Sequence, residues 1–329
     1  MSPSFCSARF SVALFLVISA VPIAYLICLE RAAPYTHVFS YHSSGFFREC
    51  AKWDDAGRRF LVSFMDGGGI GEVVPRDGDS DVLDEVTVVK DADLAGNASL
   101  GIAIDRDRNR LLVAVADLLG NRYSALAAYE LSTWRRIFLA ELSGHSIEKS
   151  FADDVAIDAH GNAYVTDAKG SKIWKVDVSG ELVSTIESPL FTPPGWYNNL
   201  VALNGIVYHP DGFLIVIHTF SGLLYKIDLT ADGDDGNKVS VIQVAGGTLR
   251  FGDGLELLSP TKIVVAGSPS AKLIESSDGW QTATVTGWFN TGMVHRIVSS
   301  ATVKEGKVYL NHIVGFGSKK RHILVEAVF

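Results

Sequence analysis

The sequence predicts an all-β fold, a six-bladed β-propeller with four-stranded blades that is preceded by an N-terminal hydrophobic helix. Self-similar segments recur along the chain at a period of about fifty residues. Each segment contains short apolar runs separated by turns rich in glycine and aspartate, a pattern typical of β-strands. Amphipathic helical periodicity is absent outside the N-terminal segment.

The N-terminal segment is nearly continuous in apolar residues from Phe10 to Leu29, with Arg9 before it. Its twenty residues are just long enough to span a bilayer, and the same pattern describes a signal peptide with a long hydrophobic region. Pro22 interrupts the run, and Ala32-Ala33 offers an imperfect cleavage site. We expect residues 1–33 to be a signal anchor or a cleaved signal peptide, with a buried helix as the third interpretation.

Either signal interpretation sends the main domain into the secretory pathway: the extracellular space, a vacuole or the ER lumen, with or without membrane anchoring through the N-terminal segment. The sequon Asn97-Ala98-Ser99 is compatible with this and predicts glycosylation of Asn97. A formal net charge of −8 and a pI near 5.6 argue against a nucleic-acid partner. The three cysteines, Cys6, Cys28 and Cys50, match neither a zinc site nor a disulfide framework.

The clearest repeat unit runs from Asp154 to Val165 and consists of a short strand, a polar glycine turn and a second strand. Residues 101–113 and 205–216 repeat this pattern, and weaker copies begin at positions 50, 254 and 301. The residues just before the six turns are 54, 105, 158, 209, 258 and 303, at intervals of 51, 53, 51, 49 and 45. Each interval holds further strand-like runs, which brings a unit to about four strands.

One blade cannot cover both faces of its own sheet, so neighbouring blades must bury one another. We therefore expect a single propeller domain over residues 34–329 without an internal linker. The ring can be closed by the N-terminal run 36–41 or by the C-terminal run 323–329, and the sequence does not choose between them.

Four of the six units place a carboxylate or an amide five residues before the turn: Glu49, Asp153, Asn204 and Asp253. In a propeller, residues at the same position of each repeat lie at the same height along the central axis. These four side chains should therefore converge at one end of the channel. The other two units have Leu100 and Val298 at this position. Each polar residue also has a structural explanation, since Asn204-Gly205 and Asp253-Gly254 are strong turn dipeptides. Agreement of phase in four units favours a common site.

A ring of this composition favours a hard divalent cation. Three carboxylates within about 5 Å of one another repel by roughly 3 kcal/mol per pair at an effective dielectric constant of about 20. Without a cation, this repulsion should raise the pKa of at least one carboxyl group. Oxygen-only ligands favour Ca²⁺, with Mg²⁺ or Mn²⁺ as alternatives.

The same residues carry a family resemblance. The opening Glu49-Cys-Ala-Lys-Trp-Asp54 resembles the E-G-P-x-W-D motif of the regucalcin/gluconolactonase family of six-bladed propellers. Residues 204–212 are similar to its N-G-[LI]-x-x-x-P-D-G motif, and residues 251–255 are similar to its P-D-G-[IM] motif. The resemblance covers the chain after residue 40 and extends to paraoxonases and strictosidine-synthase-like proteins. It implies that Glu49, Asn204 and Asp253 hold a catalytic divalent metal, with Asp153 touching metal or substrate.

The chain departs from the family pattern in three places. Cys50-Ala51 replaces Gly-Pro in the opening motif, and Asp153 replaces an asparagine, which adds a negative charge to the site. Leu100 stands where paraoxonases have a catalytic histidine. A histidine mechanism of the paraoxonase type is therefore not expected.

By resemblance, the expected activity is metal-assisted hydrolysis of a small-molecule lactone, ester or phosphotriester. Asp253 or Asp153 would act as general base or nucleophile, and Glu49 and Asn204 would hold the ion. The segment 191–199 precedes Asn204 and should reach the same end of the channel. Its residues Trp196, Tyr197 and Asn199 are therefore expected to bind substrate.

Two alternatives stay open. Residues 151–180 resemble an NHL repeat, which is common in propellers that bind partners without catalysis. In that case a calcium ion would be structural. A condensation or isomerisation similar to that of strictosidine synthases is the third hypothesis.

Overall fold

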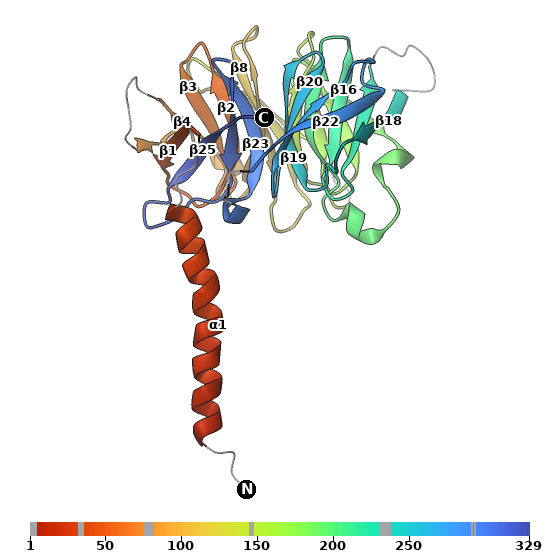
Figure 1. The fold of residues 1–329 in the computed structure, drawn as a ribbon. Helices are drawn as coiled ribbons and strands as arrows, with labels where there is room; N and C mark the ends of the chain where they lie inside the picture. Colours follow the sequence, from red (N-terminus) through yellow and green to blue (C-terminus); the bar gives the residue numbers. More distant parts are fainter. Residues whose placement is uncertain are drawn as a thin grey trace.

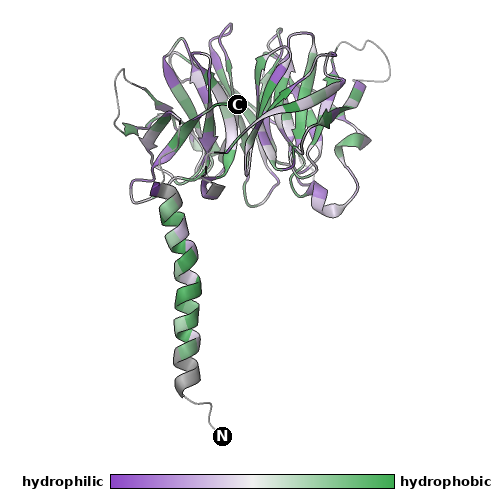
Figure 2. Ribbon diagram, in the orientation of Figure 1, coloured by the Kyte–Doolittle hydropathy of each residue, from purple (hydrophilic) through white to green (hydrophobic). Residues whose placement is uncertain are grey.

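The computed structural model describes residues 5–31, 36–75, 82–144, 148–229, 238–290, 292 and 294–329. Helix α1 (Phe5–Arg31) projects from a body of β-strands, as Figure 1 shows. Figure 2 shows that most of the helix is apolar. Its large apolar side chains, such as Phe10, Phe15 and Ile23, are exposed. Four short 3-10 helices lie in loops: η1 (Ala92–Leu94), η2 (Pro189–Phe191), η3 (Trp196–Asn199) and η4 (Val294–Arg296). The predicted N-terminal helix and all-β body are confirmed.

The strands form antiparallel units of four that follow the order of the chain. The first unit is β2 (Arg48–Asp54), β3 (Arg59–Phe64), β4 (Ile70–Val73) and β6 (Val86–Val89). The second is β7 (Ala98–Asp105), β8 (Arg110–Ala116), β9 (Ser124–Glu130) and β10 (Arg136–Glu141), and the third is β11 (Ala152–Ile157), β12 (Ala163–Asp167), β13 (Lys172–Val176) and β14 (Leu182–Glu187).

The next two units share one eight-stranded sheet. One is β15 (Leu203–His209), β16 (Phe213–His218), β17 (Leu223–Asp228) and β18 (Lys238–Ala245), and the other is β19 (Gly252–Ser259), β20 (Lys262–Gly267), β21 (Ala271–Glu275) and β22 (Thr282–Phe289). They are joined because β18 pairs in parallel with β22. This outer-edge pairing was not predicted from the sequence.

The remaining strands close the body with both ends of the chain. Strands β23 (Val298–Lys304), β24 (Lys307–His312) and β25 (His322–Ala327) are completed by β1 (Val38–His42), which pairs antiparallel with β25. The short β5 (Leu83–Asp84) adds in parallel to β1. Both predicted candidates for closure are therefore used, side by side in one sheet.

The first strands of the units contact one another in a closed circle. β2 contacts β7, β7 contacts β11, and the series continues through β15, β19 and β23 back to β2. A circle of inner strands, each followed by three strands paired outward from it, is the arrangement of a β-propeller.

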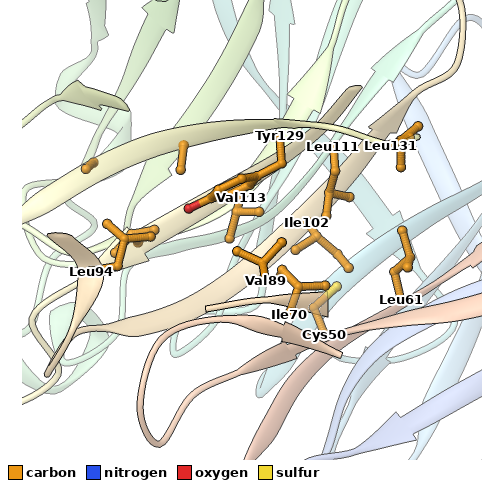
Figure 3. Close-up of a cluster of buried hydrophobic side chains, with 13 residues drawn as sticks. Cys50, Leu61, Ile70, Val89, Leu94, Ile102, Leu111, Val113, Tyr129 and Leu131 are labelled. Carbon is orange, nitrogen blue, oxygen red and sulfur yellow. The ribbon is translucent and has the colours of Figure 1, made fainter. Parts of the chain in front are cut away.

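The core lies between neighbouring sheets, as predicted from the inability of one blade to bury itself. In Figure 3, Cys50, Leu61 and Ile70 of the first unit pack against Ile102 and Leu111 of the second. Each fully buried aliphatic side chain contributes about 1.5 to 3 kcal/mol of transfer free energy. Cys50 is a free thiol, and burial raises its pKa.

Two glycines mark the close approach of inner strands. A Cβ atom on Gly205 would lie 2.3 Å from the Asp253 carbonyl oxygen, and one on Gly254 would lie 2.8 Å from the Ser299 carbonyl oxygen. Both glycines lie within strands, and neither has a positive φ. The turn-dipeptide explanation of these two positions is therefore wrong, because glycine is needed here for interstrand packing.

Candidate functional site

The four residues predicted to form a ring occupy equivalent places in the structure. Each is the second residue of an inner strand: Glu49 in β2, Asp153 in β11, Asn204 in β15 and Asp253 in β19. The sequence predicted them just before the strands, whereas they lie inside them. Leu100 is in β7, so this part of the circle is apolar. Val298 only begins β23, and the residue at the ring position of this strand is Ser299, which corrects the sequence prediction for the sixth unit.

A β-bulge accompanies each of these positions. The pairing of first and second strands shifts between Arg48 and Ala51, Ala152 and Val155, Leu203 and Ile206, and Gly252 and Leu255. The other two inner strands shift at the same height. A bulge redirects a side chain and is often found beside functional sites. The repeated bulge explains how residues of equal phase share one environment.

The structure brings the acidic side chains together. Burial, and then the charges of Asp253 and Asp153, raise the pKa of Glu49 well above its usual value. Burial and the charge of Asp253 act in the same way on the pKa of Asp153. Burial and the nearby Asp154 raise the pKa of Asp253 to about 7, while a hydrogen bond from Asn204 opposes the increase. Glu49, Asp153 and Asp253 thus influence one another electrostatically, Asn204 hydrogen-bonds to Asp253, and all but the half-buried Asp253 are buried; we call these four residues the acidic ring.

Hydrogen bonds fix the backbone that carries the acidic ring. Asn311 Nδ2 donates to the Glu49 carbonyl oxygen at 2.9 Å, and Ser299 Oγ donates to the same oxygen. Thr166 Oγ1 donates to the Asn204 carbonyl oxygen at 2.8 Å. Because these donors come from neighbouring units, the ring residues are held by the packing of the whole circle.

A second charged layer lies three residues further along the inner strands. Lys52 Nζ is 2.6 Å from Glu256 Oε2 and donates to the Ala301 carbonyl oxygen at 3.1 Å. Although burial alone would lower the pKa of Lys52, the charge of Glu256 raises it. Burial raises the pKa of Asp154 to about 6, and Lys52 opposes this. These three side chains line a cavity of about 300 Å³.

Sequence reasoning missed this layer, although a signal was present. Lys52 follows Glu49 by three positions, and Glu256 follows Asp253 by three positions. The equivalent positions in the other units are apolar. Charged residues of equal phase on otherwise apolar inner strands would have identified the pair.

The donor chemistry of the acidic ring suits a hard cation, since it offers three carboxylates and one amide. Glu49 Oε2 is buried and has no hydrogen-bond partner. Within the described part of the chain, however, no three His, Cys, Asp or Glu side chains are grouped closely enough to hold a metal ion as they stand. A cation would have to draw Glu49, Asp153 and Asp253 inward.

The predicted substrate-binding residues lie on η3. Trp196 and Tyr197 are 79% and 50% exposed, and their ring centroids are 6.2 Å apart. Asn199 Nδ2 donates to the Pro193 carbonyl oxygen at 2.9 Å, so this amide stabilises its own loop. The two aromatic residues are free to contact a ligand, whereas the Asn199 donor is already engaged.

The sequon lies where η1 meets β7. Asn97 is half-buried, and Ser99 is buried and accepts a hydrogen bond from the Gly69 N–H at 2.9 Å. Glycosylation of Asn97 stays a prediction.

No protein-family model matches this sequence, and no curated protein is significantly similar to it in sequence. Solved structures, by contrast, are similar along most of the chain. The crystal structure of the major Malassezia sympodialis allergen Mala s 1 aligns with a TM-score of 0.70 at 17% identity, covering 90% of this chain and 97% of that one.

Two lyase structures are also similar. A catalytically inactive virginiamycin B lyase from Staphylococcus aureus, solved with quinupristin, aligns with a TM-score of 0.55 at 10% identity, covering 87% of this chain and 82% of that one. A streptogramin B lyase aligns with a TM-score of 0.54 at 11% identity, covering 89% and 98%. At these identities the likeness concerns the fold. The protein is a β-propeller with a buried acidic ring, and the regucalcin/gluconolactonase family is not singled out.

Proposed function

We propose that the six four-strand units are the six blades of one propeller, and that the acidic ring is the site of a divalent-metal-dependent hydrolase acting on a lactone, ester or phosphotriester. One observation carries this proposal. Glu49, Asp153 and Asp253 come from three different inner strands, and each contributes to a buried group whose charges repel. The burial of like charges is unfavourable, and groups with strongly raised pKa values of this kind are concentrated at sites that bind a ligand or catalyse a reaction.

Each residue has a role in this proposal. Glu49, Asp153, Asn204 and Asp253 would hold Ca²⁺, or Mg²⁺ or Mn²⁺ in its place. The bound cation would supply Lewis-acid polarisation of a carbonyl or phosphoryl oxygen. Asp253, which Asn204 orients by a hydrogen bond, would accept a proton from water, with Asp153 as the alternative base. Trp196 and Tyr197 would contact the substrate from η3.

The motif resemblance to gluconolactonases and the two lyases of similar fold support an enzyme on this architecture. A binding propeller with a structural ion is the second candidate. It is favoured by the burial of the ring, because Glu49, Asp153 and Asn204 are 8%, 7% and 7% exposed. A catalytic site must admit substrate, whereas a structural ion needs no opening.

Titration calorimetry with Ca²⁺ tests the metal site. Glu49→Gln and Asp253→Asn should each abolish binding. Glu181→Gln removes an exposed carboxylate between β13 and β14 and should bind as the wild type does. Unchanged affinity in both ring variants would exclude the proposed ligand set.

Turnover separates the two candidate functions. Small lactones and aryl esters are assayed with and without a chelator. Hydrolysis that the chelator stops supports the enzyme. Tight Ca²⁺ binding without turnover supports the binding propeller.

A further inference from the structure

The loops at the acidic-ring end of the propeller expose large apolar side chains. This ring-end face consists of the loops between the second and third strands of each unit and the loops that lead into the next unit. Its large hydrophobic residues that are at least 38% exposed are Phe46, Phe47, Leu118, Leu119, Leu190, Trp196, Tyr197, Leu200, Phe251 and Ile297. Leu119 reaches 92% exposure and Trp196 reaches 79%. Exposed large apolar side chains are unusual when many of them gather at one end of a protein, and such a face is a candidate interaction site.

The opposite end of the propeller exposes different hydrophobic side chains. Its described loops expose only valines among the large hydrophobic residues, namely Val74, Val82, Val178 and Val328. Outside α1, every described exposed Phe, Tyr or Trp except Trp288 lies on the ring-end face. The asymmetry therefore concerns aromatic residues most, which are the side chains that favour the interface between water and lipid.

Two of the exposed apolar residues are also held in an unfavourable backbone conformation. Phe251 has a φ of 60° and Ile297 has a φ of 54°. The left-handed region is unusual for bulky and β-branched residues. Their exposed fractions are 50% and 46%, so neither gains full burial in return. Strain of this kind is characteristic of functional surfaces.

The charge of the face permits approach to an anionic surface. Its exposed bases are Lys90, Arg122, Lys149, Lys169, Arg250 and Lys319, and its exposed acids are Asp66, Asp93, Glu141, Glu148 and Glu187. Asp66 pairs with Arg48 and Asp93 pairs with Arg136. This end is therefore close to neutral in a chain whose net charge is −8.

Helix α1 lies on the same side. Figure 1 places it on the side of the body where η2 and η3 lie. Its apolar stretch Phe10–Cys28 is long enough to cross a membrane, and none of it is buried in the protein. The helix ends at Arg31 and β1 begins at Val38, so these two residues are at most about 25 Å apart. Val38 pairs with Val325 about midway between the two ends of the propeller, so the placement of α1 on the ring-end side rests on Figure 1.

We propose that α1 anchors the chain in a bilayer and that the ring-end face docks on the surface of that same bilayer. Trp196, Tyr197, Phe251 and Leu119 enter the headgroup region, and the exposed bases meet lipid phosphates. This inference does not depend on the proposed hydrolase activity.

Site-specific fluorescence on the full chain tests the docking. An environment-sensitive dye is placed on Leu119→Cys in a Cys6→Ser, Cys28→Ser background, where the remaining Cys50 is only 2% exposed. The matched control carries the dye on Val178→Cys at the opposite end, where the native side chain is 48% exposed. Both proteins are reconstituted into phosphatidylcholine vesicles with and without phosphatidylserine.

The emission of the dye at position 119 should shift to shorter wavelength, and lipids with a brominated acyl chain should quench it. The label at 178 should stay water-like and be quenched by iodide. Adding Trp196→Asp and Phe251→Asp should abolish the lipid signal at 119 while α1 keeps the protein on the vesicles. Aspartate tolerates the left-handed backbone at position 251, and an unchanged melting temperature verifies folding.

Three outcomes overturn the proposal. The first is water-like emission from both labels, and the second is a failure of the full chain to associate with vesicles. The third is a blue shift at 119 that disappears when the protein is diluted into excess lipid, which would show that a second copy of the chain covers the face.

Discussion

Replacing Asp253 by asparagine should stabilise the metal-free protein, because it removes a carboxylate whose charged form is disfavoured by burial and by the neighbouring Asp154. A pKa raised from 3.8 to about 7 corresponds to roughly 4 kcal/mol at 1.36 kcal/mol per pKa unit. Asp253 is only partly buried by surface area, so solvent screening reduces the expected gain to about 2 to 4 kcal/mol. Asn204 can still donate to the remaining oxygen of the new amide.

The pH dependence of this stabilisation follows from the raised pKa of Asp253. The penalty of Asp253 is complete above pH 7, where its carboxylate is charged in the folded protein. It disappears as pH falls toward 4, because the folded group is then protonated. The stabilising effect of Asp253→Asn should therefore be largest at pH 8 and absent near pH 4.

Urea denaturation at pH 8 in the presence of a chelator measures this difference. Asp158→Asn is the matched control, since Asp158 accepts hydrogen bonds on both oxygens, from Asn162 N at 2.9 Å and from Asn162 Nδ2 at 2.8 Å. That variant should lose about 1 to 3 kcal/mol. A lower stability for Asp253→Asn than for the wild type at pH 8 would refute the argument that burial and Asp154 penalise this charge. Excess Ca²⁺ should reverse the order of the two proteins.

Three further predictions concern the packing of Gly205, the acid sensitivity caused by two buried histidines, and substrate contact by Trp196. Gly205→Ala should cost about 1 to 3 kcal/mol in denaturation experiments, because its Cβ would meet the backbone of β19, whereas Gly67→Ala, with nothing within 4 Å, should be nearly neutral. Burial lowers the pKa of His322 and of His218 to about 4 each. Each histidine should therefore lower the free energy of unfolding by about 2 kcal/mol when the pH falls from 7 to 5. A His218→Gln variant that loses as much stability over this range as the wild type would contradict this. Trp196→Ala should change substrate preference in turnover assays without changing Ca²⁺ affinity, and loss of metal binding would contradict the proposal that Trp196 only contacts the substrate.

The sequence was sufficient for the all-β propeller fold, whereas the acidic ring as a metal or catalytic site stays a prediction. The repeat length and the equal phase of Glu49, Asp153, Asn204 and Asp253 are both visible in one dimension. The bulges are not, because an extra residue in a strand leaves no compositional mark. Glycine at 205 and 254 therefore suggested turns when the cause was close packing of inner strands.

Pairings that depend on three-dimensional proximity were also beyond the sequence. The parallel contact of β18 with β22 joins two outer edges, and neither strand carries a residue that specifies it. The Lys52–Glu256 ion pair, which joins residues 204 positions apart, is different, because its signal was present in the sequence as two charged residues at the same repeat position and was overlooked.

The sheet shared by the two ends of the chain has a consequence for biosynthesis. Val38 pairs with Val325, so the strand made first must wait for the strand made last. At about 5 to 20 residues per second, this delay is on the order of 15 to 60 s. During that interval the edge of β1 that later pairs with β25 is open, and an unpaired edge of this kind can pair with another chain.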